Sequence, residues 1–146
     1  MKLPTDNIIS CFYDSTNDCV KVIDTAGTLL SLNPKGYEVM EIDDPKTVIG
    51  TKWLELWSED MLPKAQAAFN QALNGKMARF EGFCPTFKGT SKWWQVDIAP
   101  LKNEFNEVQW ILAVSRDVSE LRELKVENEM LKTQLFEQQA ITKSIS

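Results

Sequence analysis

The side chains most capable of covalent chemistry in this sequence are three thiols, Cys11, Cys19 and Cys84. Their number is odd and they form no CxxC motif, which favours a reducing cytoplasm over a disulfide-bonded scaffold. Cys84 has two interpretations: a redox-sensing thiol, or a small apolar side chain on the buried face of a strand. No basic residue adjoins it in the sequence to lower its thiol pKa, and this favours the second interpretation.

Histidine is absent from the sequence, which removes the commonest general base, the commonest metal ligand and the usual phosphate acceptor of two-component kinases. The acidic pair Glu59-Asp60 could supply acid–base catalysis. At the start of a predicted helix, however, it is better explained by the favourable interaction of carboxylates with the helix dipole. The sequence contains no nucleophile motif and no phosphate-binding loop. We therefore expect neither an enzyme nor a metal-binding protein.

The overall composition sets further limits. The chain has 146 residues, of which 43% are hydrophobic, and a formal net charge of −5. One domain with an appended helix is the natural organisation at this length. The negative charge and the lack of a basic patch argue against nucleic-acid binding. The longest apolar runs, of about five residues, are too short to span a membrane, and no signal peptide is apparent. We expect a cytoplasmic protein.

Hydrophobic periodicity predicts an α+β domain with one antiparallel sheet and helices packed on one face. The predicted strands are residues 20–23, 28–32, 77–84, 93–99 and 110–114. Asn33 and Pro34 are typical of a helix start, and Asn74-Gly75 of a helix end. The predicted helical segments are the N-terminal segment and residues 33–40, 53–57 and 59–73.

The stretch from Val108 to Leu135 changes its period once. Residues 110–114 form a continuous apolar run, typical of a strand covered on both faces. From Ser119 onwards, apolar residues recur at alternating steps of three and four, as in a coiled-coil heptad. Almost no linker separates strand from helix, so Arg116 and Asp117 are the predicted signal relay. The a and d positions of the heptad are Leu121, Leu124, Asn128, Leu131, Leu135 and Gln138.

Charged residues beside this seam predict a parallel pair of helices. In a parallel dimer, Glu120 and Glu127 at g positions face Lys125 and Lys132 at e positions, whereas an antiparallel pair would juxtapose like charges. Each exposed pair contributes only about 0.2–1 kcal/mol, so the pattern determines orientation rather than stability. Asn128 at an a position is consistent with in-register pairing. The alternative is a solitary amphipathic helix folded on its own core, since the seam is only about three heptads long.

Four segments of the chain resemble a PAS domain, the small sensory module of bacterial signalling proteins. They are residues 19–34 (CVKVIDTAGTLLSLNP), 48–57 (VIGTKWLELW), 83–101 (FCPTFKGTSKWWQVDIAPL) and 108–123 (VQWILAVSRDVSELRE). The last segment is similar to the Asp-Val/Ile-Thr/Ser-Glu signature that joins a PAS core to its signalling helix. The resemblance implies the sheet order 2-1-5-4-3, with a pocket between the inner face of the sheet and the helices.

The resemblance also assigns faces to the last three strands. The residues expected to line the pocket are Trp53, Phe80, Cys84, Trp94, Val96, Ile98, Ile111, Ala113 and Ser115. None of them is charged, so we expect any natural ligand to be small and largely apolar. On the outer face, Trp110, Leu112 and Val114 are too apolar for water and need cover from the N-terminal helix or from a second subunit.

Departures from the family argue against its known cofactors. Light-sensing LOV members carry a reactive Cys in an Asn-Cys-Arg-Phe-Leu-Gln motif, where this sequence has Trp53. Haem-binding members mostly use an axial His; a Cys or Met ligand is the alternative. We expect neither haem nor LOV-type flavin chemistry. Trp94 could stack on a flat ligand such as a flavin, or it could fill the pocket as core beside Trp53 and Phe80.

The sequence as a whole predicts a cytoplasmic, non-catalytic PAS module that senses or dimerises. Residues 1–16 are the predicted N-terminal capping helix, 17–117 the PAS core and 118–146 the coiled-coil helix. The helix passes the signal to an output domain of the same parent chain, which would be a kinase, a cyclase or a transcription regulator. The alternative is a redox sensor that holds a flavin or another cofactor. The predicted homodimer interface is Trp110, Leu112, Val114, Leu121, Leu124, Asn128, Leu131 and Leu135.

Overall fold

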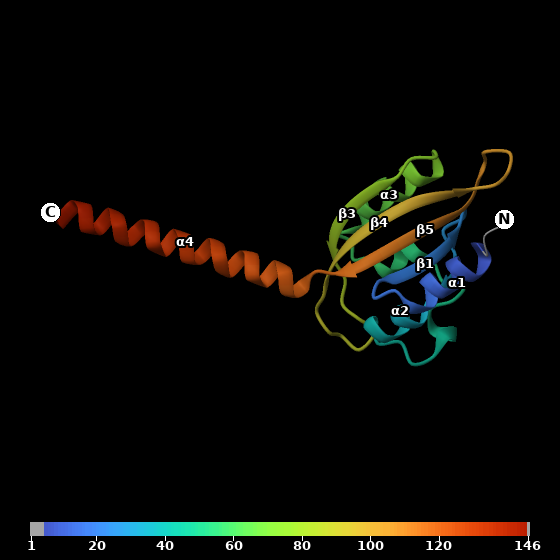
Figure 1. Ribbon diagram of the computed structural model, residues 1–146, viewed down its shortest axis with the longest axis horizontal. Coiled ribbons are helices and arrows are strands. Elements are labelled where there is room, and N and C mark those ends of the chain that lie inside the picture. The colour runs from blue at the N-terminus through green and yellow to red at the C-terminus, as the bar shows by residue number, and fades with distance from the viewer. Residues whose placement is uncertain (1–4, 146) are drawn as a thin grey trace.

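A computed structural model describes residues 5–145 of the chain. Its five-stranded sheet has the order β2-β1-β5-β4-β3 (Figure 1), and every neighbouring pair of strands is antiparallel. The predicted α+β class and the predicted strand order are confirmed. The strands are β1 (Cys19–Asp24), β2 (Leu29–Leu32), β3 (Ala78–Phe83), β4 (Trp93–Lys102) and β5 (Val108–Asp117).

Strand β5 occupies the centre of the sheet, between β1 and β4. Ala113 lies opposite Lys21 on one side and Ile98 on the other, and Ser115 lies opposite Cys19. All five residues are buried on the inner face of the sheet. A displacement of β5 would therefore disturb two neighbouring strands and the core at once.

Strand β4 continues beyond its predicted end at Ala99, as far as Lys102. Strand β3 pairs with β4 only over residues 93–98, so the remainder of β4 pairs with β5 alone. Pro100 lacks a backbone N–H, and proline is tolerated where one side of a strand is unpaired. The edge position explains why this proline does not end the strand.

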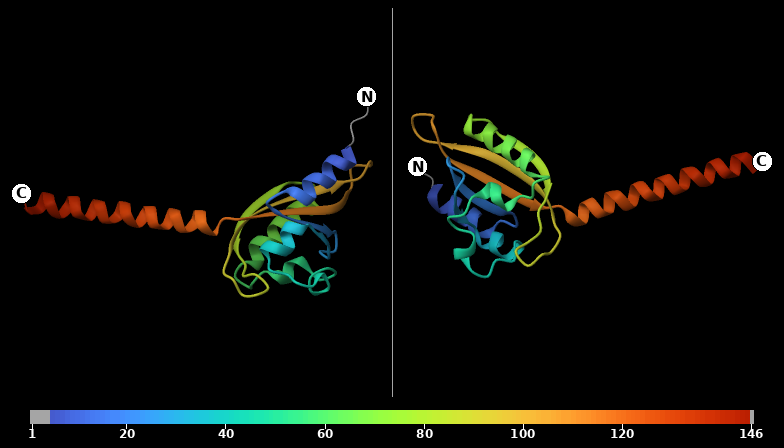
Figure 2. Two further views of the ribbon diagram at one scale, coloured as in Figure 1. Left: turned by 60° about the horizontal axis from the view of Figure 1, so that its bottom comes forward. Right: turned by 180° about the vertical axis from the view of Figure 1, so that it is seen from behind.

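Helical segments cover the inner face of the sheet (Figure 2). Asn33 caps α2 as predicted, because its side-chain oxygen accepts a hydrogen bond from the Gly36 N–H at 3.0 Å, with Pro34 in the first turn. Four residues of α3 are buried against the sheet, including Phe69. The segments are α2 (Pro34–Val39), the 3-10 helices η1 (Pro45–Thr47) and η2 (Trp53–Leu56), and α3 (Leu62–Leu73).

Helix α3 begins at Leu62, later than the predicted start at Glu59. A turn precedes it, in which the Met61 N–H donates to the Ser58 carbonyl at 3.0 Å. Glu59 and Asp60 lie in this turn, and no acidic residue occupies the first turn of the helix. The helix thus starts three residues later than predicted, and the two carboxylates precede its N-terminus instead of lying in its first turn.

Helix α1 (Thr5–Ser15) lies beside β1 and α2 (Figure 1). The Tyr13 hydroxyl is hydrogen-bonded to the Ser31 hydroxyl on β2, and the Tyr13 carbonyl accepts from the Asn33 side chain at 3.0 Å. Ile8, Ile9 and Phe12 remain exposed. The helix is thus anchored near its C-terminal end and presents an apolar face to the outside.

Helix α4 (Ser119–Ile145) begins directly after β5 and projects away from the core (Figure 1). Its apolar side chains are exposed, as at Leu121 (51%) and Leu131 (58%). The alternative of a helix folded on its own core is therefore wrong. Pairing of α4 with a second helix stays a prediction.

Candidate functional site

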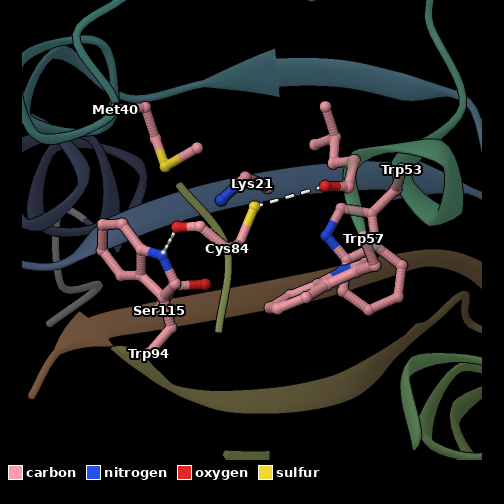
Figure 3. Close-up of a pocket in the computed structure, with 8 residues that line it drawn as sticks. Lys21, Met40, Trp53, Trp57, Cys84, Trp94 and Ser115 are labelled. Atoms are coloured by element: carbon pink, nitrogen blue, oxygen red, sulfur yellow. Dashed lines mark hydrogen bonds between the residues drawn. The ribbon is translucent and has the colours of Figure 1, made fainter. Parts of the chain in front are cut away.

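A small cavity lies between the inner face of the sheet and the segments that cover it (Figure 3). Its volume is about 10 Å³, close to the space that one water molecule needs. The lining side chains come from β1, β4, β5, η2 and adjacent loops, so the cavity is in contact with three of the five strands. They are Lys21, Met40, Trp53, Leu56, Trp57, Cys84, Trp94 and Ser115.

Four of the nine predicted pocket residues line this cavity: Trp53, Cys84, Trp94 and Ser115. The other five do not line it and belong to the surrounding core. The reason is that indole rings occupy the space above these strands; the Phe80 ring, for example, packs against Trp57 with ring centroids 5.2 Å apart. The five core residues are Phe80, Val96, Ile98, Ile111 and Ala113.

Trp94 is held in place by a hydrogen bond as well as by packing. Its indole N–H donates to the Cys84 carbonyl at 2.9 Å, and the residue is 2% exposed (Figure 3). Trp53 packs edge-on against Trp57, with centroids 6.0 Å apart. A buried tryptophan whose indole N–H already has a hydrogen-bond acceptor is typical of a packed core. The structure thus favours the core interpretation of Trp94 over a stacking platform.

Cys84 lies between Trp94 and the Trp53–Trp57 pair (Figure 3). Its thiol donates to the Leu56 carbonyl at 3.2 Å. Burial raises the pKa of the Cys84 thiol, and the charge of Lys21 opposes this shift only in part. Because the thiolate is the reactive form, this environment disfavours redox chemistry at Cys84. The structure places it as the small buried side chain of the second interpretation.

Four lining residues were not predicted from the sequence: Lys21, Met40, Leu56 and Trp57. Lys21 is the charged one among them. It is 4% exposed, and its side chain reaches from β1 into the space between Trp94 and the Trp53–Trp57 pair (Figure 3). The prediction of an uncharged lining is therefore wrong, because the lining contains the ammonium group of Lys21. The alternation of a strand could have indicated it, since Cys19, Lys21 and Ile23 share one face.

The junction of β5 with α4 is the second part of the site. Asp117 Oδ1 accepts hydrogen bonds from the Ser119 N–H at 3.0 Å and the Ser119 hydroxyl at 2.6 Å, while Oδ2 accepts from Lys92 Nζ at 2.8 Å. Burial acts to raise the pKa of Asp117, but the hydrogen bonds from Lys92 and Ser119 outweigh it and lower the pKa. Asp117 therefore caps α4 and ties it to the residue before β4. Its partner on the core is Lys92, not Arg116.

Further contacts join the first turn of α4 to the sheet. The Val118 N–H donates to the Trp93 carbonyl, and the Trp93 N–H donates to the Ser119 hydroxyl, both at 2.9 Å. The Arg122 guanidinium lies 3.6 Å from the centroid of the Trp93 ring, a cation–π contact. Arg116 points elsewhere and forms an exposed ion pair with Asp18 at 3.3 Å, which contributes little.

A family model described as a PAS fold matches residues 13–123. The chain belongs to the PAS family. The match includes the whole sheet, the cavity and the first residues of α4, and it confirms the resemblance that the sequence motifs indicated. This assigns the chain to a family of sensor domains. No curated protein matches the sequence.

Solved PAS structures share the fold at low sequence identity. The PAS domain of a protein from Colwellia psychrerythraea has a TM-score of 0.71 and 15% identity, covering 80% of this chain and 98% of that one. An RNA-binding Light-Oxygen-Voltage receptor has a TM-score of 0.73 and 20% identity; the match covers 88% of this chain but 37% of the receptor. A domain of a sensory box sensor histidine kinase/response regulator from Geobacter sulfurreducens has a TM-score of 0.64 and 18% identity, covering 77% and 94%.

The cavity on the inner face of this PAS domain is small. A cavity of about 10 Å³ is far below the roughly 300–1,000 Å³ of pockets that hold cofactors or drug-sized ligands. Trp53, which the sequence resemblance aligns with the reactive Cys of LOV members, is 1% exposed. Among residues 5–145, no group of His, Cys, Asp and Glu side chains is arranged to hold a metal ion.

The residues predicted for a dimer interface lie on two surfaces of the PAS domain. On the outer face of the sheet, Val114 is opposite the buried Val20, whereas Trp110 towards the other end of β5 is 42% exposed. The seam residues of α4 are all exposed, Asn128 included. No helix in the described part of the chain is long and apolar enough to cross a membrane.

Proposed function

We infer that this PAS domain is a sensor module that passes a rearrangement of its inner cavity to an output domain through α4. The observation that carries the proposal is the continuity of β5. Ser115 of this strand lines the cavity, and Asp117, two residues later, caps α4. A shift of the strand at Ser115 is therefore delivered to the helix within a few ångströms of chain.

The rigidity of the joint supports the same proposal. Val118, the residue between β5 and α4, is 9% exposed and hydrogen-bonded to Trp93. With Lys92 bound to Asp117 and Arg122 stacked on Trp93, the start of α4 is attached to β4 as well as β5. A helix attached in this way follows the sheet instead of moving freely on a flexible tether.

Helix α4 of one copy pairs with α4 of a second copy in a parallel coiled coil. The support is the row of exposed apolar side chains along the helix, such as Leu124 at 55% and Leu135 at 58%. Together with Trp110, these surfaces need cover from water. The charges at Glu120 and Lys125 favour the parallel orientation.

The module works in the cytoplasm without catalytic activity and without haem or flavin. Its output domain, a kinase, a cyclase or a transcription regulator, belongs to the same parent chain. The similarity to a domain of a sensor histidine kinase/response regulator supports a signalling parent.

Insertions into α4 test the relay. Each inserted residue turns the downstream helix by about 100°, so one residue placed after Glu123 moves the seam out of register. Seven residues restore it to within about 20°. Output of the full-length parent, measured with and without stimulus for inserts of one to eight residues, should vary with a period of seven. A smooth decline with insert length indicates a flexible tether and rules out the relay.

The dimer has its own test. Analytical ultracentrifugation of this chain at tens of micromolar should give a dimeric mass. Replacing Asn128 with Leu should raise the stability of the dimer and loosen control of its oligomeric state, because a buried polar a-position residue specifies register at a cost in stability. A monomeric mass with α4 still helical by circular dichroism would contradict the pairing.

A further inference from the structure

The buried ammonium group of Lys21 lacks a counter-charge. Lys21 is 4% exposed, and its Nζ donates a hydrogen bond to the Cys19 sulfur at 3.0 Å. Sulfur is a weak acceptor. Among the side chains that the structure describes, no carboxylate forms an ion pair with Lys21. Removing an ammonium group from water without a counter-charge destabilises a fold, which suggests that a ligand supplies the missing charge.

A second donor in the same cavity has no partner. Trp57 is 9% exposed, and its indole Nε1–H is a buried polar group without a hydrogen-bond acceptor among the described residues. The contrast with Trp94 is direct, since the Trp94 indole N–H donates to the Cys84 carbonyl. A buried donor left unpaired costs about 1–3 kcal/mol, so native proteins rarely keep one without a ligand, an ion or a water.

The third polar group is the Ser115 hydroxyl, which lines the cavity from β5 opposite Cys19. No Asp or Glu is among the lining residues. The Cys84 thiol is already used, because it donates to the Leu56 carbonyl. The residues that line the cavity thus carry an ammonium, an indole N–H and a hydroxyl, and no carboxylate is among them. An acceptor-only ligand with negative charge complements such a lining better than a neutral donor–acceptor does.

We propose that this cavity is a binding site for a small monovalent anion, held by Lys21 Nζ, Trp57 Nε1–H and the Ser115 hydroxyl. The inference names the ligand class of the sensor proposed above and rests on that proposal for its role in signalling. A volume of about 10 Å³ accommodates a group of roughly the size of one water molecule. A halide has this size. The carboxylate of a small organic acid requires the flexible side chain of Met40, which lines the same cavity, to move aside.

The position of the site connects it with the relay. Lys21 lies on β1 opposite Ala113 of β5, and Ser115 itself belongs to β5. An anion that draws Lys21 and Ser115 together acts across the β1–β5 pair, two residues before the Asp117 cap. Trp57 belongs to the covering side of the cavity, so the anion also links the sheet to that layer.

Indole N–H resonances provide the test, because the chain has five tryptophans and each contributes one side-chain signal. The isolated chain, labelled with nitrogen-15, is titrated with sodium bromide, sodium formate and sodium butyrate at constant ionic strength maintained with sodium sulfate. Trp57→Phe identifies the Trp57 signal. We expect this signal to move saturably with bromide and with formate. If butyrate also moves the signal, the natural ligand is a larger organic acid. If butyrate does not move it, the natural ligand is a small anion no larger than formate.

Two variants and one control complete the experiment. Lys21→Met should weaken anion binding by about tenfold or more, because it removes the charged donor, and it should still fold because it replaces an unpaired buried charge with an apolar side chain. Ser115→Ala should weaken binding less. Lys64→Met is the matched control, since Lys64 is exposed on α3, and binding should be unchanged.

The proposal is overturned if no anion moves the Trp57 signal saturably, or if Lys21→Met binds as well as the unaltered chain. These outcomes concern binding alone. The insertion series in the full-length parent tests the relay without any anion being specified, so failure of one proposal is distinguishable from failure of the other.

Discussion

Asn33 connects three elements of the PAS core through one side chain, and its replacement by alanine should destabilise the domain. The residue is fully buried. Its side-chain oxygen accepts hydrogen bonds from the Val20 N–H at 2.8 Å and the Gly36 N–H at 3.0 Å. Its side-chain nitrogen donates to the carbonyls of Tyr13 and Asp18, both at 3.0 Å. The end of α1, the start of β1 and the first turn of α2 therefore meet at this amide.

The magnitude follows from which of these groups water can reach. The bonds to Val20 and Gly36 are buried, so Asn33→Ala leaves two unpaired N–H groups at about 1–3 kcal/mol each. The carbonyls of Tyr13 and Asp18 are only partly buried, and water can replace the lost donor at little cost. The expected loss in free energy of unfolding is about 2–6 kcal/mol, a large share of the roughly 5–15 kcal/mol typical of a domain.

Urea unfolding monitored by tryptophan fluorescence measures this loss, at one fixed protein concentration because any dimerisation adds to stability. Asn74→Ala is the matched control. Asn74 is exposed at the end of α3, so its replacement should change stability by no more than about 0.5 kcal/mol. A loss below about 1 kcal/mol for Asn33→Ala, or equal losses for both variants, would refute the reasoning.

Three further predictions concern Asp117, the cysteines and Gly82. Burial acts to raise the pKa of Asp117, but hydrogen bonds from Lys92 and Ser119 outweigh it and lower the pKa below its ordinary 3.8. The stability that the ionised Asp117 contributes is therefore complete above that value and is lost as the pH falls through the folded pKa. Asp117→Asn should accordingly flatten the acid-induced fall in the urea midpoint between about pH 5 and pH 2, and an unchanged profile would count against the cap. Because burial raises the pKa of the Cys84 thiol, with the charge of Lys21 opposing, iodoacetamide at neutral pH should alkylate the exposed Cys11 much faster than Cys84, as peptide mass spectrometry can show; equal rates would contradict this. A methyl group on Gly82 would lie 2.8 Å from Cζ3 of Trp57, so Gly82→Ala should lower the free energy of unfolding by about 1–3 kcal/mol, and full stability in the urea assay would argue against this packing.

Local patterns predicted the architecture because each element carries its own signal. Alternation placed Trp94 and Cys84 on one face, and both are buried there. The Asn33-Pro34 pair identified the start of α2 because capping is a property of adjacent residues. The change of period after Asp117 marked the junction of β5 with α4 for the same reason.

The contents of the cavity could not be predicted, because they depend on how side chains from distant segments share one space. Nothing local indicates that Trp57 would occupy the volume beside Phe80 and exclude it from the cavity. Lys21 was missed for a different reason. A lysine in a strand normally faces water, and this expectation outweighed the alternation that puts Lys21 on the same face as Cys19 and Ile23.

The length of α4 turns its attachment into a lever. Its 27 residues extend over about 40 Å at 1.5 Å per residue. A tilt of about 5° at Val118 therefore carries the far end sideways by about 3.5 Å, as this rise implies. Apolar contacts end at separations of about 4.0–4.5 Å. A change in angle too small to rearrange the sheet could thus separate two paired helices near Ile141 while leaving them in contact near Leu121. Mechanical advantage of this kind makes the far end of the helix, rather than the cavity, the place where a spin-label distance measurement would register the largest response.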